Sequence, residues 1–304
     1  MKSWPFLRAG DRVDIIAPAS HGPLDRLAKG KAWLEAAGLK VHVPEKLIDP
    51  DLFFASELRA QVSQLQDALF SESRAIWCLR GGYGSMRLIP LLKKIRPPTK
   101  PKLFVGFSDV TALHLFFQQE WKWPTLHGRT IGQLSVDGTS PDLEELRQVL
   151  FGEVKKCDYT GLVPLNAAAR KAGTIEGTMA GGNLKLLQTS IGTPWEVRPQ
   201  GKLLFIEDVG ERGYSIHRML EQLRQAKLLR PRALLVGDLT DGVEKDGSDK
   251  TMDAIQRIAD EVDFPVMSGF HSGHHPDRNR PMPLGVKGTL RLGKNPRLTS
   301  VLSP

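Results

Sequence analysis

Three polar side chains that together could attack an acyl bond each follow a short apolar run in the sequence: Ser108, Glu207 and His274. A serine hydroxyl is a poor nucleophile near neutral pH. It therefore needs an imidazole to accept its proton, and a carboxylate to fix the tautomer of that imidazole. The three residue types, in this order along the chain, are consistent with nucleophilic catalysis by a serine.

The serine lies at a predicted corner between a strand and a helix. The apolar run from Leu103 to Val105 predicts a buried strand, and the spacing of apolar residues from Asp109 to about Gln119 predicts a helix. Backbone N–H groups that open a helix face outward at such a corner, which suits a reaction that creates an oxyanion. The alternative is structural, because Ser108 or Asp109 could simply cap the helix.

A glycine-rich turn, Arg80 to Gly84, directly follows another apolar run, from Ala75 to Leu79. Adjacent glycines let a backbone turn with positive φ and bring bare N–H groups against a ligand. If both runs are strands of one parallel sheet, this turn and Ser108 leave the same carboxyl edge, where ligands bind in such sheets. This shared edge favours the catalytic interpretation of Ser108.

The spacing of residues along the chain does not decide which carboxylate would orient the histidine. Glu207 could orient the histidine or pair with Arg212, and Asp208 or Glu211 could take its place. The order serine, acid, histidine also occurs in α/β-hydrolases. However, Val110 stands where their motif has its second glycine, so we predict similar chemistry on a different fold.

A metal site is the other interpretation of the histidine segment. His271, His274, His275 and Asp277 carry side chains that suit Zn²⁺. Their spacing is not that of an H-E-x-x-H motif, and the prolines around them predict a loop rather than a helix face. We therefore predict neither a metal nor another cofactor.

Composition is that of an ordinary globular protein: 304 residues, 40% hydrophobic and 25% charged. No apolar run reaches the roughly 18 to 20 residues that cross a bilayer. Arg8 and Asp11 interrupt the N-terminal segment, so we expect no signal peptide. The two cysteines, Cys78 and Cys157, are too few for a disulfide framework, and Cys78 is predicted to be a buried core thiol. We expect a cytoplasmic protein.

The net charge of +8 raises the question of an anionic partner. The Lys and Arg residues are scattered, and neither a zinc-finger spacing nor an RNA-binding signature is present. We therefore predict no nucleic-acid or membrane partner, and infer that the charge attracts a small anionic substrate.

Strands alternate with helices over the first half of the chain, which is typical of a mostly parallel sheet with helices on both faces. The second half alternates similarly and ends, over 285–301, in a pattern typical of a hairpin. We predict an α/β fold with three segments: an N-terminal nucleophile domain (1–152), a linker (153–172) and a C-terminal domain that carries the acid and the histidine (173–304).

Five ordered blocks of this sequence resemble those of the LD-carboxypeptidases, serine peptidases of the murein tetrapeptide carboxypeptidase type. The blocks are Arg80-Gly-Gly-Tyr-Gly84, Gly106-Phe-Ser-Asp-Val-Thr111, Gly181-Gly-Asn-Leu184 with Ile191-Gly-Thr-Pro194, Leu204-Phe-Ile-Glu-Asp-Val-Gly-Glu211, and Gly273-His274 with Pro283-Leu-Gly285. The resemblance runs from about Gly10 to Gly285. It also extends to the microcin C self-immunity peptidases.

The resemblance implies a flavodoxin-like N-terminal domain, a C-terminal β-rich α/β domain, an active site between them and a homodimer. It assigns Ser108 as nucleophile, Glu207 as orienting acid and His274 as general base. It also places the oxyanion hole at the backbone N–H of Asp109 and at the turn formed by Gly81 and Gly82.

The predicted reaction is release of the terminal D-Ala from a muropeptide tetrapeptide by hydrolysis of an L,D peptide bond. Arg80, Tyr83 and Asn183 are predicted to contact this anionic substrate, with Arg80 either holding its carboxylate or bracing the glycine turn. Two segments depart from the family pattern and could alter substrate preference: His127-Gly128-Arg129, where the family often has His-Gly-Pro, and the His- and Arg-rich stretch from His271 to Arg280.

Two alternatives remain open at this point. One is an immunity-type peptidase or amidase with the same triad that cleaves a peptidyl- or aminoacyl-nucleotide conjugate. The other is a non-catalytic α/β ligand-binding module in which Ser108 only caps a helix.

Overall fold

The computed structural model describes residues 2–134 and 140–302. The chain divides into two compact units, and each is considered by itself. Among the described residues, unit 1 contains 2–134, 140–155 and 280–282, and unit 2 contains 156–279 and 283–302. The chain thus leaves unit 1 once and returns to it briefly near its end.

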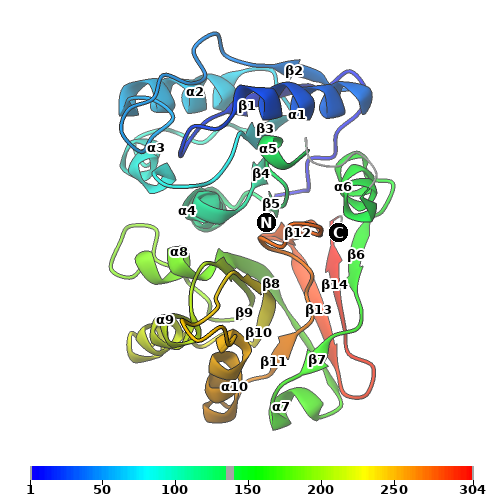
Figure 1. Ribbon diagram of the computed structural model, residues 1–304. Helices are drawn as coiled ribbons and strands as arrows, with labels where there is room; N and C mark the ends of the chain where they lie inside the picture. Colours follow the sequence, from blue (N-terminus) through cyan, green and yellow to red (C-terminus); the bar gives the residue numbers. More distant parts are fainter. Residues whose placement is uncertain (1, 135–139, 303–304) are drawn as a thin grey trace. The chain divides into compact units, whose positions relative to one another are not determined.

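Unit 1 is an α/β domain in which strands and helices alternate (Figure 1). Its strands are β1 (Arg12–Ile16), β2 (Lys40–His42), β3 (Ala75–Cys78), β4 (Leu103–Gly106) and β5 (Thr125–His127), and β12 (Met282–Leu284) completes the sheet. Its α-helices are α1 (Leu24–Ala36), α2 (Leu58–Phe70), α3 (Ile89–Leu92), α4 (Thr111–Phe116), α5 (Ile131–Leu134) and α6 (Pro141–Phe151).

The sheet of unit 1 has the strand order β12-β5-β4-β3-β1-β2. Strands β1 to β5 pair in parallel throughout, which confirms the predicted mostly parallel sheet. Every residue of β3, β4 and β5 is buried, as expected for short apolar strands covered on both faces. In this register the ends of β3 and β4 lie side by side, because Trp77 pairs with Val105.

Close helix packing fixes the layers around this sheet. Helix α1 packs against α5, and a Cβ on Gly30 would lie only 2.3 Å from the carbonyl oxygen of Ile131. Helix α2 packs against β1, and the side-chain amide of Gln61 donates to the carbonyl oxygens of Ala17 and Ala19 just beyond that strand. The loop that follows β1 is thereby held in place.

Unit 2 combines a parallel sheet with antiparallel strands at its sides. Its strands are β6 (Lys156–Tyr159), β7 (Val163–Pro164), β8 (Gly173–Asn183), β9 (Lys202–Val209), β10 (Ala233–Thr240), β11 (Val266–Ser268), β13 (Lys287–Leu292) and β14 (Arg297–Val301). Its α-helices are α7 (Ala167–Arg170), α8 (Leu184–Thr189), α9 (Gly213–Gln225) and α10 (Thr251–Glu261).

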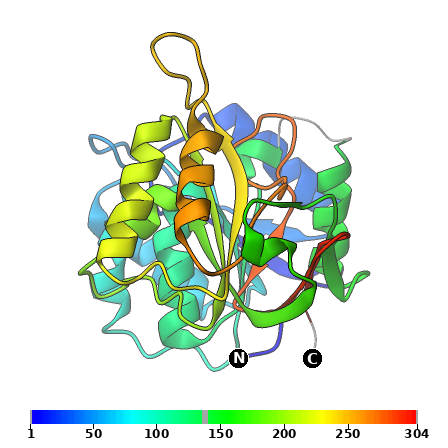
Figure 2. The same cartoon turned by 90° about the horizontal axis from the view of Figure 1, so that it is seen from below.

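The sheet of unit 2 has the order β6-β14-β13-β8-β9-β10-β11-β7. Strands β8 to β11 are parallel, whereas β13, β14, β6 and β7 pair antiparallel with their neighbours. Helices α9 and α10 lie side by side on this sheet (Figure 2). The closing hairpin expected over 285–301 is formed by β13 and β14.

Three segments differ in detail from the predictions. Residues 153–172, predicted as a linker, contain β6, β7 and α7, and they belong to unit 2 from Lys156 onward. These elements are two to four residues long, too short to give a periodic pattern. The helix expected from Asp109 is a 3₁₀ turn, then α4, then a π-helical turn over 117–121. The apolar run over 201–206 predicts a strand that ends before Glu207, but strand β9 continues to Val209, so Glu207 lies within it.

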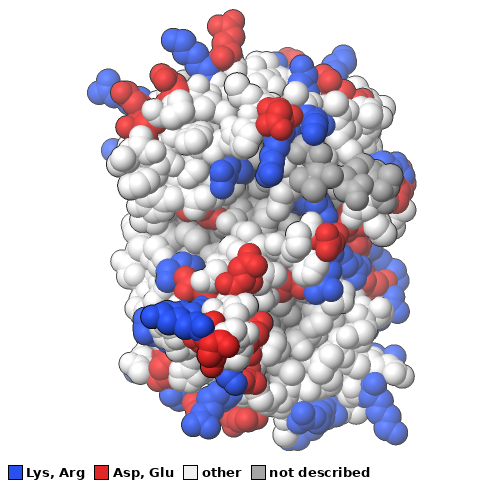
Figure 3. All heavy atoms as spheres, in the orientation of Figure 1, with Lys and Arg blue, Asp and Glu red and all other residues white. Residues whose placement is uncertain are grey.

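The surface shows no dominant patch of one charge on the face drawn in Figure 3, where basic and acidic side chains are interspersed. Among residues 2–134 and 140–302, no helix is both long and apolar enough to cross a membrane.

Candidate active site

Ser108 occupies a tight corner at the end of β4. Strand β4 ends at Gly106, where a Cβ would lie 2.9 Å from Cγ2 of Val110 and 3.0 Å from Cβ of Cys78. The half-buried Ser108 has a φ of +69°, in the left-handed region that residues other than glycine rarely adopt. Such strain persists only where surrounding structure holds it, and it is concentrated at functional sites.

The glycine turn lies directly against this corner. A Cβ on Gly81 would be 2.7 Å from Cβ of Ser108 and 3.3 Å from the backbone nitrogen of Asp109. A side chain at position 81 would therefore fill the space beside the hydroxyl and beside the Asp109 N–H. The absence of a side chain keeps that space open for an acceptor atom.

Two side chains hold the glycine turn in place. The hydroxyl of Ser20 accepts the N–H of Tyr83 at 3.0 Å. The carboxylate of Asp109 accepts the N–H groups of Gly84 and Ser85 at 3.2 and 2.8 Å. Burial raises the pKa of Asp109, and these hydrogen bonds oppose that rise. Local sequence does not indicate either role, since Ser20 is distant in sequence and the position of Asp109 predicts only a helix cap or a backbone donor.

Two other reactive side chains near this corner have structural roles. Nε2 of His114 donates to the carbonyl oxygen of Gly106 at 2.9 Å, and burial lowers the pKa of His114 to about 3, so the ring stays neutral. Burial also raises the pKa of Cys78, with the nearby Asp109 charge adding to the effect. The Cys78 thiol is therefore a core side chain, as predicted.

Two of the three predicted substrate contacts lie on the same turn. Arg80 is exposed and donates from Nη1 to the carbonyl oxygen of His21 at 3.1 Å, so it braces the neighbouring loop. Tyr83 is 47% exposed, and its ring packs against Phe53 and Phe54. Both side chains remain accessible to a ligand.

Unit 2 provides the acid and the base. Oε2 of Glu207 and Nδ1 of His274 are 2.6 Å apart, and the Glu207 side chain is fully buried. With Nδ1–H donating to the carboxylate, neutral His274 carries its lone pair on Nε2. Burial would lower the pKa of His274, but the charge and hydrogen bond of Glu207 raise it above its ordinary value. The pair is thus arranged as a base and its orienting acid.

A glycine allows the histidine loop to approach the acid this closely. Gly273 has a φ of +143°, and a Cβ there would lie 3.1 Å from Oε2 of Glu207. Its N–H donates to Oδ1 of Asn279 at 3.2 Å, and the carbonyl oxygen of Ser272 accepts the N–H of Asp238. These contacts fix the loop on the end of β10.

The two other candidate acids are engaged elsewhere. The Asp208 carboxylate accepts the side-chain amide of Asn183 at 3.0 Å and the N–H of Lys185 at 2.9 Å. Burial, and then the charge of Glu207, raise the pKa of Asp208 to about 7. Glu211 accepts the Ser215 hydroxyl and pairs with the Lys185 ammonium group. Of the three acids left open by spacing, Glu207 is the one that contacts His274.

Asn183, the third predicted substrate contact, is buried and caps a helix. Its side-chain oxygen accepts the N–H of Leu186 at 3.2 Å, at the start of α8, while its amide donates to Asp208. The Gly-Gly-Asn motif thus positions α8. The Asn183 side chain therefore has a structural role as a helix cap. The preference of asparagine for the position before a helix indicates this role from the sequence.

The departures from the family pattern are largely explained by ion pairs. Arg129 is buried, and its Nε and Nη2 both donate to Oδ2 of Asp142, at 3.0 and 2.7 Å. Arg280 makes a bidentate pair with Glu145 of α6, with both distances 2.7 Å. In unit 2, Arg278 pairs with Asp238 at 2.9 Å. These arginines tie loops to helices and strands within each unit.

Two of the four candidate metal ligands make hydrogen bonds through their imidazole rings. His274 pairs with Glu207, and Nδ1 of His275 accepts the N–H of Asp277 at 3.2 Å. Within the described ranges, no group of three or more His, Cys, Asp or Glu side chains is placed to share a metal ion.

The chain is similar to proteins named as carboxypeptidases. The chain is 38% identical over 267 residues to a protein of Rickettsia conorii named as a carboxypeptidase, covering 86% of this chain and 82% of the relative. It is 29% identical over 287 residues to the murein tetrapeptide carboxypeptidase of Pseudomonas aeruginosa, covering 92% of each.

Solved structures match as well. The muramoyltetrapeptide carboxypeptidase of Oxalobacter formigenes aligns with a TM-score of 0.77 at 26% identity, covering 96% of this chain and 99% of that one. The microcin C7 self-immunity protein in complex with aspartyl sulfamoyl adenosine aligns with a TM-score of 0.82 over 99% and 98% of the two chains. Its 20% identity shows a common fold only.

Two family patterns cover most of the chain. The LD-carboxypeptidase N-terminal domain matches residues 13–128, which include the Ser108 corner and the glycine turn. The LD-carboxypeptidase C-terminal domain matches residues 176–290, which include Glu207 and His274. The chain belongs to the LD-carboxypeptidase family.

Proposed function

We propose that this protein is a serine carboxypeptidase that releases the terminal D-Ala from muropeptide tetrapeptides. Ser108 acts as nucleophile, His274 as general base and Glu207 as the orienting acid. The observation that carries the proposal is the 2.6 Å contact between the buried Glu207 carboxylate and Nδ1 of His274. This contact leaves the lone pair of the neutral ring on Nε2, the nitrogen that must accept a proton.

The first step acylates the enzyme. The Ser108 oxygen attacks the carbonyl carbon of the L,D peptide bond and gives its proton to Nε2 of His274. The negative charge that develops on the carbonyl oxygen is held by the N–H groups of Asp109 and of the turn at Gly81 and Gly82. Donors preorganised for this charge typically contribute a large part of the rate enhancement. His274 then protonates the D-Ala nitrogen, and the bond between carbon and nitrogen breaks.

The second step releases the shortened peptide. A water molecule gives a proton to His274 and attacks the ester carbon, and the same N–H groups hold the second oxyanion. His274 then returns the proton to the Ser108 oxygen as the ester bond breaks. The products are D-Ala and the shortened peptide, and the enzyme is regenerated.

The free carboxylate of the terminal D-Ala requires a cation. Arg80 is exposed, and it is the first residue of the turn that contacts the Ser108 corner. Nη1 of its guanidinium donates to the carbonyl oxygen of His21, and a guanidinium group carries five N–H donors in all. We propose that Arg80 holds this carboxylate, with Tyr83 beside it. We further propose that the protein forms a homodimer, as the family resemblance implies, and that it is cytoplasmic.

Incubation of the purified protein with a disaccharide tetrapeptide, followed by mass spectrometry, tests the proposal. We expect a product shorter by one D-Ala, and a loss of about three or more orders of magnitude in kcat for Ser108→Ala. Unchanged hydrolysis by Ser108→Ala would show that the nucleophile lies elsewhere. The same assay with an aminoacyl sulfamoyl adenosine separates the immunity-type activity, which would be the better substrate if that alternative holds.

A further inference from the structure

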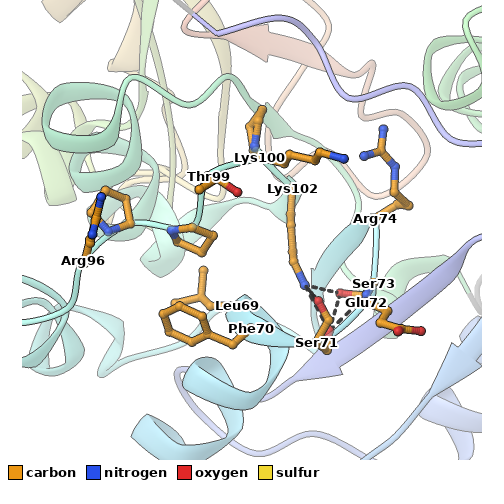
Figure 4. A pocket seen from close by; sticks show the side chains of 13 residues that line it. Leu69, Phe70, Ser71, Glu72, Ser73, Arg74, Arg96, Thr99, Lys100 and Lys102 are labelled. Atoms are coloured by element: carbon orange, nitrogen blue, oxygen red, sulfur yellow. Dashed lines mark hydrogen bonds between the residues drawn. The ribbon is translucent and has the colours of Figure 1, made fainter.

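Unit 1 contains a cavity at the opposite edge of its sheet from Ser108. Its volume is about 730 Å³, and it lies between the segment 69–74 that precedes β3 and the segment 96–102 that precedes β4 (Figure 4). Ser108 and the glycine turn follow the carboxyl ends of the same two strands. The cavity is therefore separate from the nucleophile corner, and its size is within the usual range of ligand pockets.

One buried lysine joins the two walls of this cavity. In Figure 4 the side chain of Lys102 extends from the 96–102 segment to the opposite segment. Its Nζ donates to the carbonyl oxygens of Ala68 and Ser71 at 2.6 and 2.7 Å, and lies 3.0 Å from the hydroxyls of Ser71 and Ser73. The facing wall carries three prolines, which restrict its backbone. The cavity is thus largely preformed.

The charge around the cavity is unbalanced. Four cationic side chains line it and only one carboxylate, that of Glu72, does so. Three of the cations, Arg74, Arg96 and Lys100, make no ion pair within the part of the chain that the structure describes. Like charges around one cavity repel one another, and an anion bound between them would relieve this repulsion.

The uncharged lining has a polar part and an apolar part. Ser71, Ser73 and Thr99 form the polar part. Leu69, Phe70 and the three prolines form the apolar part, and Phe70 is 60% exposed. An exposed aromatic ring beside a group of cations favours a ligand that has a flat or apolar part as well as negative charge. A simple inorganic anion would leave this wall unused.

We propose that this cavity binds an organic phosphate, a small molecule with two or more negative charges on phosphate and an attached ring. Arg74, Arg96 and Lys100 contact the phosphate oxygens, since guanidinium and ammonium donors both suit phosphate. Phe70 packs against the ring. Lys102 shapes the cavity through its contacts with the protein. The proposal does not depend on the reaction at Ser108.

Calorimetric titration of the full-length protein with ADP at low salt tests the proposal, with pyrophosphate and sulfate as comparison anions. We expect ADP to bind more tightly than pyrophosphate, and both more tightly than sulfate. The double variant Arg96→Gln/Lys100→Gln should weaken ADP binding by at least about ten-fold. Phe70→Ala should weaken ADP but leave pyrophosphate unchanged. Thermal unfolding of each variant verifies that the fold is intact.

A matched control separates the cavity from general attraction to a basic protein. Lys93→Gln/Lys94→Gln removes the same charge from exposed positions near this segment but outside the cavity lining. We expect this variant to bind ADP within two-fold of the wild type. Equal weakening by both double variants, binding of ADP no tighter than sulfate, or no binding at all would each overturn the proposal.

Discussion

The imidazole of His274 can accept a proton only while it is neutral, so its pKa sets the acid limit of activity. Burial acts to lower this pKa, and the Glu207 carboxylate more than offsets that effect. In the proposed mechanism, kcat/KM therefore rises as the pH increases through a pKa above the ordinary histidine value.

The variant Glu207→Gln tests this dependence. Removing the negative charge lowers the pKa of His274, so the acid limb of the pH profile should move to lower pH. The rate at the optimum should fall by about 10⁴-fold, because the tautomer of the ring is no longer fixed. Asp208→Asn is the control, since it removes a neighbouring carboxylate that does not contact the ring, and it should shift the limb less. Equal shifts in both variants would contradict a specific role for Glu207.

The missing side chain at Gly81 gives a second test. In Gly81→Ala the new methyl group would meet the Ser108 side chain and the Asp109 N–H. We expect kcat to fall at least about ten-fold, because one oxyanion donor is displaced or blocked. Gly128→Ala is a suitable control, as its Cβ would make only ordinary contacts of 3.7 Å and longer. Steady-state kinetics provide the measurement. Wild-type activity in Gly81→Ala would exclude an oxyanion hole at this turn.

The positions of Ser108, Glu207 and His274 could be predicted because each follows an apolar run that predicts a buried strand. The residues that hold these side chains in place could not be predicted. Ser20 reaches the turn from the loop that follows β1, and the contact between Asp208 and Asn183 joins positions 25 residues apart. Such contacts depend on how strands are ordered in a sheet, which local patterns do not encode.

At the scale of elements, the buried ion pair of Arg129 and Asp142 connects the end of β5 to the start of α6. Their side chains are 5% and 6% exposed. Removing one partner leaves the other charge buried without compensation, which typically destabilises a protein by about 3–5 kcal/mol. Breaking this pair is therefore predicted to lower the unfolding free energy of unit 1 by more than breaking one of its surface ion pairs.

Urea unfolding of Arg129→Met and Asp142→Leu tests this prediction. Each single variant should lose about 3–5 kcal/mol of unfolding free energy. The double variant Arg129→Met/Asp142→Leu should recover most of that loss, because no unpaired charge remains. Additive losses in the double variant would show that the two side chains act independently.

Short paired elements were the hardest part of the fold to predict. Strand β7 has two residues and β6 has four, and both are stabilised by pairing with β11 and β14, from the C-terminal part of unit 2. Strand β12 is similar, since it joins the sheet of unit 1 from far along the chain. Long amphipathic helices need no such context. The spacing of apolar residues predicts helices over 215–225 and 252–262, and α9 and α10 begin and end within two residues of these positions.

At the scale of the whole molecule, the net charge of +8 should assist capture of an anionic muropeptide. This attraction acts at long range, so it is screened by salt. We expect kcat/KM for a free tetrapeptide to fall by roughly three- to ten-fold between low salt and about 0.5 M salt. A substrate of the same sequence with fewer negative charges is the control. An equal fall for both substrates would indicate a salt effect on the enzyme itself.

The backbone of Ser108 has one further consequence. A glycine at this position would adopt the same left-handed conformation without strain, and would favour folding by about 1–2 kcal/mol. A threonine would fit worse, because a branched side chain is strongly disfavoured there. Glycine would give the more stable protein at this position, but it would lack the hydroxyl that the proposed reaction needs. The left-handed φ of residue 108 therefore makes the choice of side chain a compromise between stability and reactivity.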